Sequence, residues 1–101
     1  MRTYAVTWRG KMGAVHAGKL ELGAEALTLE GGSARKTIRY DELVEVHVGR
    51  GPDERLQGRP ALVLRRRRGD PLYVSSLNGP GVAVEIAELL ASLGAGSGSG
   101  S

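Results

Sequence analysis

The sequence predicts a single mainly-β domain closed by one C-terminal amphipathic helix. From Thr3 to Val74, apolar and polar residues alternate with a period of two, the pattern of strands that bury one face. After Asn78-Gly79 the period changes to 3.6, as in a helix with one apolar stripe. Segments rich in Gly and Pro separate about seven alternating runs, which indicates about seven short antiparallel strands.

The alternation assigns an inward face to each expected strand. Ala61–Leu64 is apolar on both faces, which predicts a strand covered on both sides. Leu72–Val74 is expected to be the last strand, Asp41–Leu43 a corner or a single helical turn, and Gly49–Arg59 a loop. The residues expected to face the core in the other strands are Tyr4, Val6, Trp8, Leu20, Leu22, Leu27, Leu29, Ile38, Tyr40, Val44, Val46 and Val48.

The helix is expected to begin near Pro80, because proline suits the first helical turn. Glu85 then lies near the positive N-terminal end, and Gly94 is expected to end the helix. The apolar stripe that should pack on the sheet consists of Val82, Ile86, Leu89, Leu90 and Leu93.

Length and composition limit the class of protein. The 101 residues suit one domain at 1–94, followed at 95–101 by a flexible Gly/Ser linker or an added tail. The absence of Cys excludes disulfides and thiolate catalysis. No apolar run approaches a membrane span of about 20 residues, so we expect a cytoplasmic protein, with the inner face of the membrane as an alternative position. Abundant Arg, Ala and Gly without Phe suggests a GC-rich bacterium.

Seven strands followed by an amphipathic helix resemble the pleckstrin-homology superfold, in particular its small bacterial and GRAM-like versions. The resemblance is carried by Gly18–Leu22, Ala26–Leu29 and the segment Ile38–Val46, which has the form I-x-Y-x-x-L-x-x-V. It implies two near-orthogonal packed sheets that form a partly open barrel, with the helix at one end. It also implies that bacterial members form rings or other homo-oligomers.

The run Arg65, Arg66, Arg67 and Arg68 is the most unusual local feature. Because neighbouring strand residues face opposite sides, the four cannot form one stripe, and we expect the strand to leave the sheet here. One interpretation is a phosphate-binding tip, since guanidinium groups match phosphate oxygens. The alternative is a solvated hairpin end that pairs with Asp70 and nearby acids.

A second candidate phosphate site comprises Arg9, Lys11 and Lys19 around the first hairpin. In phosphoinositide-binding pleckstrin-homology domains, the loop between the first two strands carries a basic cluster. Here that loop is short and has one lysine, so the resemblance implies weak adhesion to anionic lipid rather than specific inositide recognition.

Patterns of catalysis and metal binding are missing from the sequence. There is no G-x-S-x-G and no phosphate loop, so we expect a protein that is not an enzyme and has no cofactor. His16 and His47 are too few for a metal site. Most of the four aromatic residues fall on inward faces, which favours packing in the core over stacking on nucleic acid.

These observations favour a non-enzymatic scaffold that acts by protein–protein interaction or homo-oligomeric assembly. Peripheral binding to an anionic phospholipid membrane through the basic hairpin tips is the alternative. Nonspecific contact with nucleic acid is a weaker alternative, consistent with a net charge of only +3.

Overall fold

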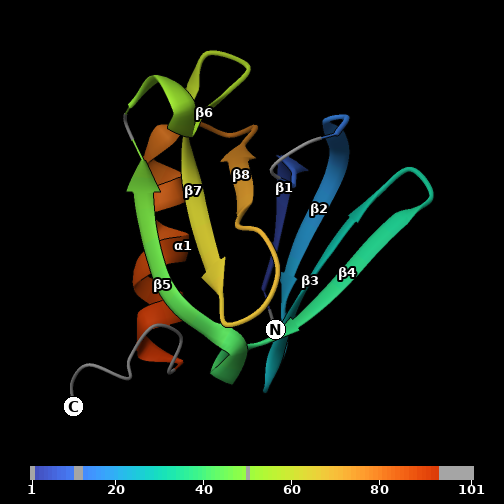
Figure 1. Ribbon diagram of the computed structural model, residues 1–101, viewed down its shortest axis with the longest axis vertical. Coiled ribbons are helices and arrows are strands. Elements are labelled where there is room, and N and C mark those ends of the chain that lie inside the picture. Colours follow the sequence, from blue (N-terminus) through green and yellow to red (C-terminus); the bar gives the residue numbers. More distant parts are fainter. Residues whose placement is uncertain (1, 11–12, 50, 94–101) are drawn as a thin grey trace.

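The computed structural model describes residues 2–10, 13–49 and 51–93. Within them, seven strands form one curled antiparallel sheet, a two-residue strand pairs beside it, and one helix follows (Figure 1). The predicted mainly-β class with a closing helix is confirmed. The elements are β1 (Arg2–Arg9), β2 (His16–Leu22), β3 (Ala26–Gly31), β4 (Ala34–Arg39), η1 (Tyr40–Glu42), β5 (Leu43–Gly49), η2 (Pro52–Glu54), β6 (Arg55–Leu56), β7 (Arg59–Arg66), β8 (Leu72–Ser76) and α1 (Pro80–Ser92).

The strands follow one continuous path in the order β4-β3-β2-β1-β8-β7-β5, and β6 pairs with β7 outside that path. Every pair is antiparallel. The half made of β2–β4 and the half made of β5, β7 and β8 are joined because β1 pairs with both β2 and β8. The structure is therefore a half-barrel with one hydrogen-bonded sheet, in which the two expected halves are continuous.

The core lies on the concave face of this sheet. The predicted alternation is confirmed in β2, in β3 and around Ile38 of β4, where inward residues are buried and the intervening residues are more exposed. In β1, Val6 and Trp8 are buried as expected, but Tyr4 is half-buried and the intervening Thr7 is buried too. The predicted double coverage of residues 61–64 is confirmed as well, because all four side chains are buried. The core cluster comprises Val6, Trp8, Leu20, Leu22, Leu27, Leu29, Ile38, Tyr40, Leu43, Leu62, Leu64, Leu72, Val74, Ile86 and Leu90.

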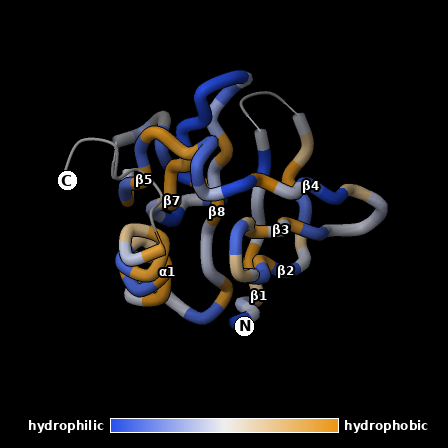
Figure 2. The backbone as a smooth tube through the Cα atoms, turned by 90° about the horizontal axis from the view of Figure 1, so that it is seen from below, coloured by the Kyte–Doolittle hydropathy of each residue, from blue (hydrophilic) through white to orange (hydrophobic). Residues whose placement is uncertain are grey.

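The helix packs against β5, β7 and β8 rather than against the whole barrel (Figures 1 and 2). Pro80 occupies its first turn, as predicted, and Ile86 and Leu90 reach the core. Leu93 was expected on the buried stripe, but it is 42% exposed. The helix ends at Ser92 and Leu93 is its C-cap residue, whose N–H still donates to the carbonyl of Leu89 at 3.0 Å, so Leu93 keeps the helical spacing but lies at the exposed end of the helix. The expected stop at Gly94 lies outside the described residues.

The prediction that Val44 faces the core is wrong, because its side chain is 48% exposed. The pairing of β5 with β7 shifts register between Leu43 and Glu45, so Val44 is the extra residue of a bulge. Leu43 becomes the inward residue instead, while Val46 and Val48 still pack partly against the core. A single inserted residue of this kind leaves no mark in the hydrophobic pattern.

The segment 49–59 was expected to be a loop, but it contains η2 and β6. A two-residue turn with Gln57 at φ 55° and Gly58 at φ 80° joins β6 to β7, as in a tight hairpin with both central residues left-handed. Leu56 is buried to 1% exposure. Because β6 has only two residues, it shows no alternation from which a strand could be predicted.

A charged cluster fixes η2 to β5. The Nε2–H of His47 donates to Oε2 of Glu54 at 2.9 Å, and Nδ1 lies 2.9 Å from Oε2 of Glu45 without hydrogen-bond alignment. The two carboxylates contact opposite nitrogens of the ring, so they do not converge on a metal position. Gly49 permits the approach of η2, because a Cβ there would overlap the Cβ of Glu54.

We expect Leu90→Ala to lower the free energy of unfolding by about 2–5 kcal/mol, since Leu90 is fully buried between helix and sheet. Urea unfolding measures the change. Leu93→Ala is the matched control and should change stability by less than about 0.5 kcal/mol, because Leu93 is 42% exposed. Small, equal changes in both variants would show that the helix does not dock.

We expect the contact of His47 with Glu54 to make stability depend on pH. The hydrogen bond from His47 holds the pKa of Glu54 below its ordinary value of 4.5. A carboxyl whose pKa is lowered by folding stabilises the protein above its unfolded pKa, and this stabilisation is lost as pH falls through the folded pKa. Glu45 and Arg65 also face this cluster.

Chemical unfolding between pH 7 and pH 3 tests this expectation. Glu54→Gln should flatten the loss of stability on the acid side, whereas Glu88→Gln, on the exposed face of α1, should keep the wild-type profile. If the two variants give superimposable profiles, the His47 contact does not contribute.

Candidate functional site

A cleft of about 450 Å³ opens where three parts of the sheet come together: the β1–β2 loop, the start of β4 and the β7–β8 turn. We call it the basic cleft, because its wall carries Arg35, Lys36 and Arg66 against the single carboxylate of Asp70 among the described residues. The complete wall is formed by Trp8, Gly10, Gly13, Ala14, His16, Ala34, Arg35, Lys36, Arg66, Asp70 and Leu72.

Lys36 and Arg66 enter the cleft because they occupy core-facing positions of their strands, whereas Arg35 lies on the opposite face of β4, where it pairs with Glu30. Lys36 pairs directly with the buried Leu29, and paired residues project from the same face of a sheet. Arg66 continues the inward series of β7 at the same spacing of two. His16 pairs with Trp8 in the same way. At this end of the half-barrel, inward positions thus change from apolar to basic.

Trp8 forms the inner wall of the basic cleft and is 1% exposed. Its indole N–H donates to the main-chain carbonyl of Glu30 at 3.1 Å, and its ring lies 4.6 Å from the ring of His16. Gly31 makes room for this arrangement, because a Cβ there would lie 3.2 Å from the indole nitrogen and 2.7 Å from Cβ of His16. The indole is therefore held in one position at the base of the cleft.

Arg66 shapes the β7–β8 turn as well as the cleft. Its Nε–H and one Nη2–H donate to the carbonyl of Asp70 at 3.1 and 2.7 Å. Gly69 takes φ 86°, a left-handed conformation that favours glycine, and so lets the turn close on the guanidinium. Arginine has five N–H donors, so this contact leaves donors for a ligand.

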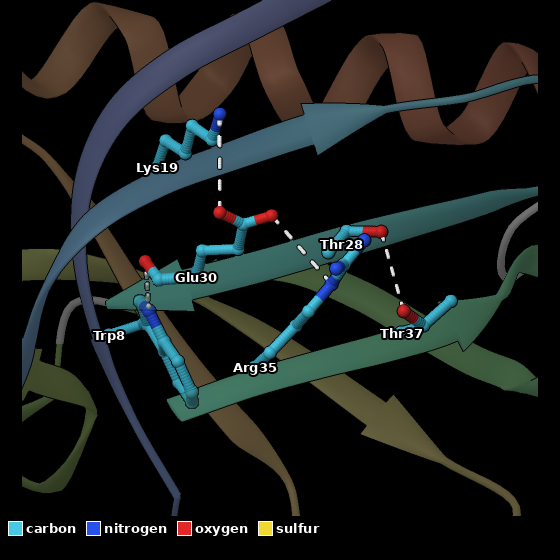
Figure 3. A network of polar contacts seen from close by, with 6 residues as sticks. All are labelled: Trp8, Lys19, Thr28, Glu30, Arg35 and Thr37. Atoms are coloured by element: carbon cyan, nitrogen blue, oxygen red, sulfur yellow. Dashed lines mark hydrogen bonds and ion pairs between the residues drawn. The ribbon is translucent and has the colours of Figure 1, made fainter. Parts of the chain in front are cut away.

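Lys19 and Arg35 belong to a cross-strand charge network centred on Glu30 (Figure 3). Residues Lys19, Glu30 and Arg35 lie side by side on β2, β3 and β4, and the Glu30 carboxylate is 4.0 Å from Nζ of Lys19 and 3.7 Å from Nε of Arg35. Thr28 and Thr37 form the next pair along the strands. The predicted candidate Lys19 is therefore held on the sheet and does not line the basic cleft.

The other candidates of the first hairpin are placed differently. Arg9 is half-buried, donates to the carbonyl of Gly10 at 2.9 Å and lies 4.6 Å over the ring of Tyr73. Lys11 lies outside the described residues. Of this candidate site the structure therefore describes Arg9 and Lys19, and these two contact different partners.

The four consecutive arginines separate, as strand alternation predicts. Arg65 pairs across the sheet with Glu45, with 3.4 Å between Nε and Oε1. Arg67 donates from Nε to the carbonyl of Asp41 at 3.1 Å, and Arg68 is exposed in the turn. Only Arg66 of the four lines the basic cleft.

Sequence reasoning missed Arg35, Lys36, His16 and the position of Trp8 in the cleft. A signal for Lys36 is present, since it stands two residues before the inward-facing Ile38 and must share its face. A lysine at a core-facing position marks the place where the core ends. The proximity of β4 to the β7–β8 turn, in contrast, depends on the curl of the sheet, so no local sequence pattern predicts it.

Comparison with known proteins adds information on the fold alone. No protein-family model matches the chain, and no curated protein matches it. Among solved structures, the chain is similar to the C-terminal domain of an unknown protein from Leishmania infantum, with a TM-score of 0.71 and 14% identity over 90% of this chain and 83% of that one. In the described ranges, no helix has the length and apolar character needed to cross a membrane. The resemblance to pleckstrin-homology domains stays a prediction, whereas the curled antiparallel half-barrel with one C-terminal helix is a fold shared with a known structure.

Proposed function

We propose that the protein is a non-catalytic binding module that attaches to anionic phospholipid membranes by taking a lipid phosphate into the basic cleft. The observation that carries this proposal is the meeting of Lys36 and Arg66 at one cleft, with Asp70 as the one carboxylate on its described wall. Its volume of about 450 Å³ is within the range of ligand pockets, about 300–1,000 Å³.

The chemistry of these side chains favours a phosphate. Arginine offers paired N–H donors that fit two phosphate oxygens, while lysine adds a mobile point charge. Arg67 and Arg68 stand beside the cleft in the β7–β8 turn and extend its positive field. Each basic residue near an anionic membrane contributes about 1 kcal/mol, so a few such residues suffice for reversible attachment at the inner face of a membrane.

Homo-oligomeric assembly or protein binding is the second candidate, favoured by the edges of the sheet. β4 and β5 end the strand path, so each presents one edge without a strand partner among the described residues. β4 carries Arg35, Lys36 and Arg39, and such charges discourage strand addition. β5 instead exposes Val44 to 48%, which makes β5 the edge that suits another strand.

Nucleic-acid contact is less well supported by the placement of the aromatic residues. Trp8 and Tyr40 are buried, and Tyr4 and Tyr73 are half-buried. Binders of single strands rely on exposed rings on which bases stack. The membrane proposal does not need such rings.

We expect the double variant Lys36→Gln, Arg66→Gln to bind anionic vesicles about 30-fold more weakly, which corresponds to about 1 kcal/mol for each charge removed. Flotation with vesicles of phosphatidylcholine containing one third phosphatidylglycerol measures the affinity, and raising the salt should weaken the wild-type binding steeply. The emission of Trp8, the only tryptophan, reports whether the cleft is occupied.

The matched control is Arg2→Gln with Lys19→Gln, which removes the same charge outside the basic cleft. It should lose clearly less affinity than the cleft variant. Arg66→Lys keeps the charge and should restore much of the binding if the turn remains folded. Equal losses in the two double variants, or normal vesicle binding of the cleft variant, would contradict the proposal.

Assembly predicts a particle mass several times 10.6 kDa that hardly changes with salt. Multi-angle light scattering on a sizing column at low and high salt measures it. Val44→Glu should return the mass to that of a monomer, because it places a charge on the β5 edge, whereas the cleft variant should leave the mass unchanged. A wild-type mass of one chain at both salts would rule out self-assembly.

A further inference from the structure

The basic cleft contains one side chain whose charge can change near neutral pH, and that side chain is His16. The other charged residues of its described wall are Arg35 and Lys36 on β4, and Arg66 and Asp70 at the β7–β8 turn. As classes, lysine, arginine and aspartate keep their charge between pH 5 and 8, whereas histidine gains or loses a proton in that range. The net charge of the cleft can therefore be changed by protonating a single residue.

The strands beside His16 present no charged group to it. On β1 its pairing partner is Trp8, which projects from the same face of the sheet. On β3 its neighbour is Gly31, where an added Cβ would lie 2.7 Å from Cβ of His16. The adjacent Glu30 projects from the opposite face, where its carboxylate contacts Lys19. The charged groups that His16 faces are therefore those of the cleft wall.

Both ring nitrogens of His16 are available to a ligand. Within the described part of the chain, the His16 side chain makes no hydrogen bond or ion pair, and neither of its nitrogens is buried. Its ring lies 4.6 Å from the ring of Trp8, at an angle of 39°. An indole attracts a cation that lies within about 6 Å of its ring, so a protonated His16 can keep this position and still donate to an anion.

The second histidine, His47, is placed quite differently. It pairs with Val63 on β7 and does not line the basic cleft. Its two ring nitrogens each lie 2.9 Å from a carboxylate oxygen, one of Glu45 and one of Glu54. Because the chain has only these two histidines, His47 is a matched control for His16.

We infer that protonation of His16 makes the basic cleft a pH-sensitive attachment site, which rests on the membrane attachment proposed above. When protonated, His16 is a further cation beside Lys36 and Arg66 and donates an N–H to the lipid phosphate. When deprotonated, its ring adds no charge to the cleft. Attachment therefore tightens as the pH falls, and by the reciprocity of linked equilibria the bound phosphate favours uptake of the proton by His16.

Flotation with vesicles of phosphatidylcholine containing one third phosphatidylglycerol, at pH 7.5 and pH 5.5, tests this inference across the range in which histidine titrates. The phosphodiester of phosphatidylglycerol keeps its single charge at both pH values, so a change in affinity comes from the protein. We expect the wild type to bind about fivefold more tightly at the lower pH, as for one added charge near a membrane.

The emission of Trp8 gives a second readout, because a protonated imidazole beside an indole quenches its emission. The pH at which this emission is half changed should rise by about 0.7 when saturating vesicles are present, since a fivefold change in affinity and the uptake of the proton are linked. In the variant His16→Gln this transition should be absent.

Three variants assign the effect to one residue. His16→Gln should bind vesicles with the same affinity at both pH values. His16→Arg carries a permanent charge, so it should bind tightly at both pH values, and it provides the test if His16→Gln does not fold. His47→Gln should keep the wild-type ratio between the two affinities.

The outcomes separate this inference from the proposed function. Equal wild-type affinities at the two pH values, a wild-type ratio in His16→Gln, or loss of the ratio in His47→Gln would overturn the role of His16 and leave the membrane attachment in place. Absence of wild-type binding to the vesicles at both pH values would overturn both.

Discussion

The pairing of β1 along both of its edges is the interaction on which the rest of the structure depends. Residues Val6, Thr7 and Trp8 each pair with β2 on one side and with β8 on the other. At these positions β1 connects the strands β2–β4 to the strands β5, β7 and β8, on which α1 packs. Without this double pairing, β2–β4 and β5–β8 would be two small sheets, each with a further exposed edge and half of the core.

The same strand places the basic cleft and the start of α1. Trp8, opposite Val74, forms the inner wall of the basic cleft, whereas Val6 pairs with Ser76 near the end of β8, shortly before α1 begins. The two pairs are separated by about 7 Å along the strand, at the usual rise of about 3.3 Å per residue. The sheet that β1 completes thus holds the basic cleft at a fixed position relative to the strands that carry the helix.

Most of the fold is predictable from the sequence because burial imposes a period on each strand and on the helix. The features that the sequence does not predict involve one or two residues each. The bulge exposes Val44 without disturbing the apolar pattern, and β6 is too short to show alternation. Leu93 keeps the helical spacing but lies at the exposed C-terminal end of the helix. For the bulge and for β6, the local hydrogen bonding, rather than hydrophobicity, decides the structure.

The candidate site is less predictable, because it is formed by register and curl. The run from Arg65 to Arg68 attracts attention as a cluster, yet pairing with β5 and η1 engages Arg65 and Arg67 elsewhere. Lys36 and Arg66 are far apart in the chain and meet only because the sheet curls. Each could be recognised from the sequence as a basic residue at a core-facing position. The sequence does not indicate that the two residues line the same cleft.

The change from apolar to basic residues along the inward face has a physical origin. A half-barrel does not close on itself, so the concave face must emerge into solvent where the helix does not cover it. In β7 the inward series Leu62, Leu64 and Arg66 passes from full burial to partial exposure. An apolar residue at the last position would be exposed, whereas the long arginine side chain keeps its stem on the core and its charge in water. The open end of the half-barrel therefore both ends the apolar core and places basic residues around it. A ligand that binds these basic residues uses positions that the stability of the sheet already requires.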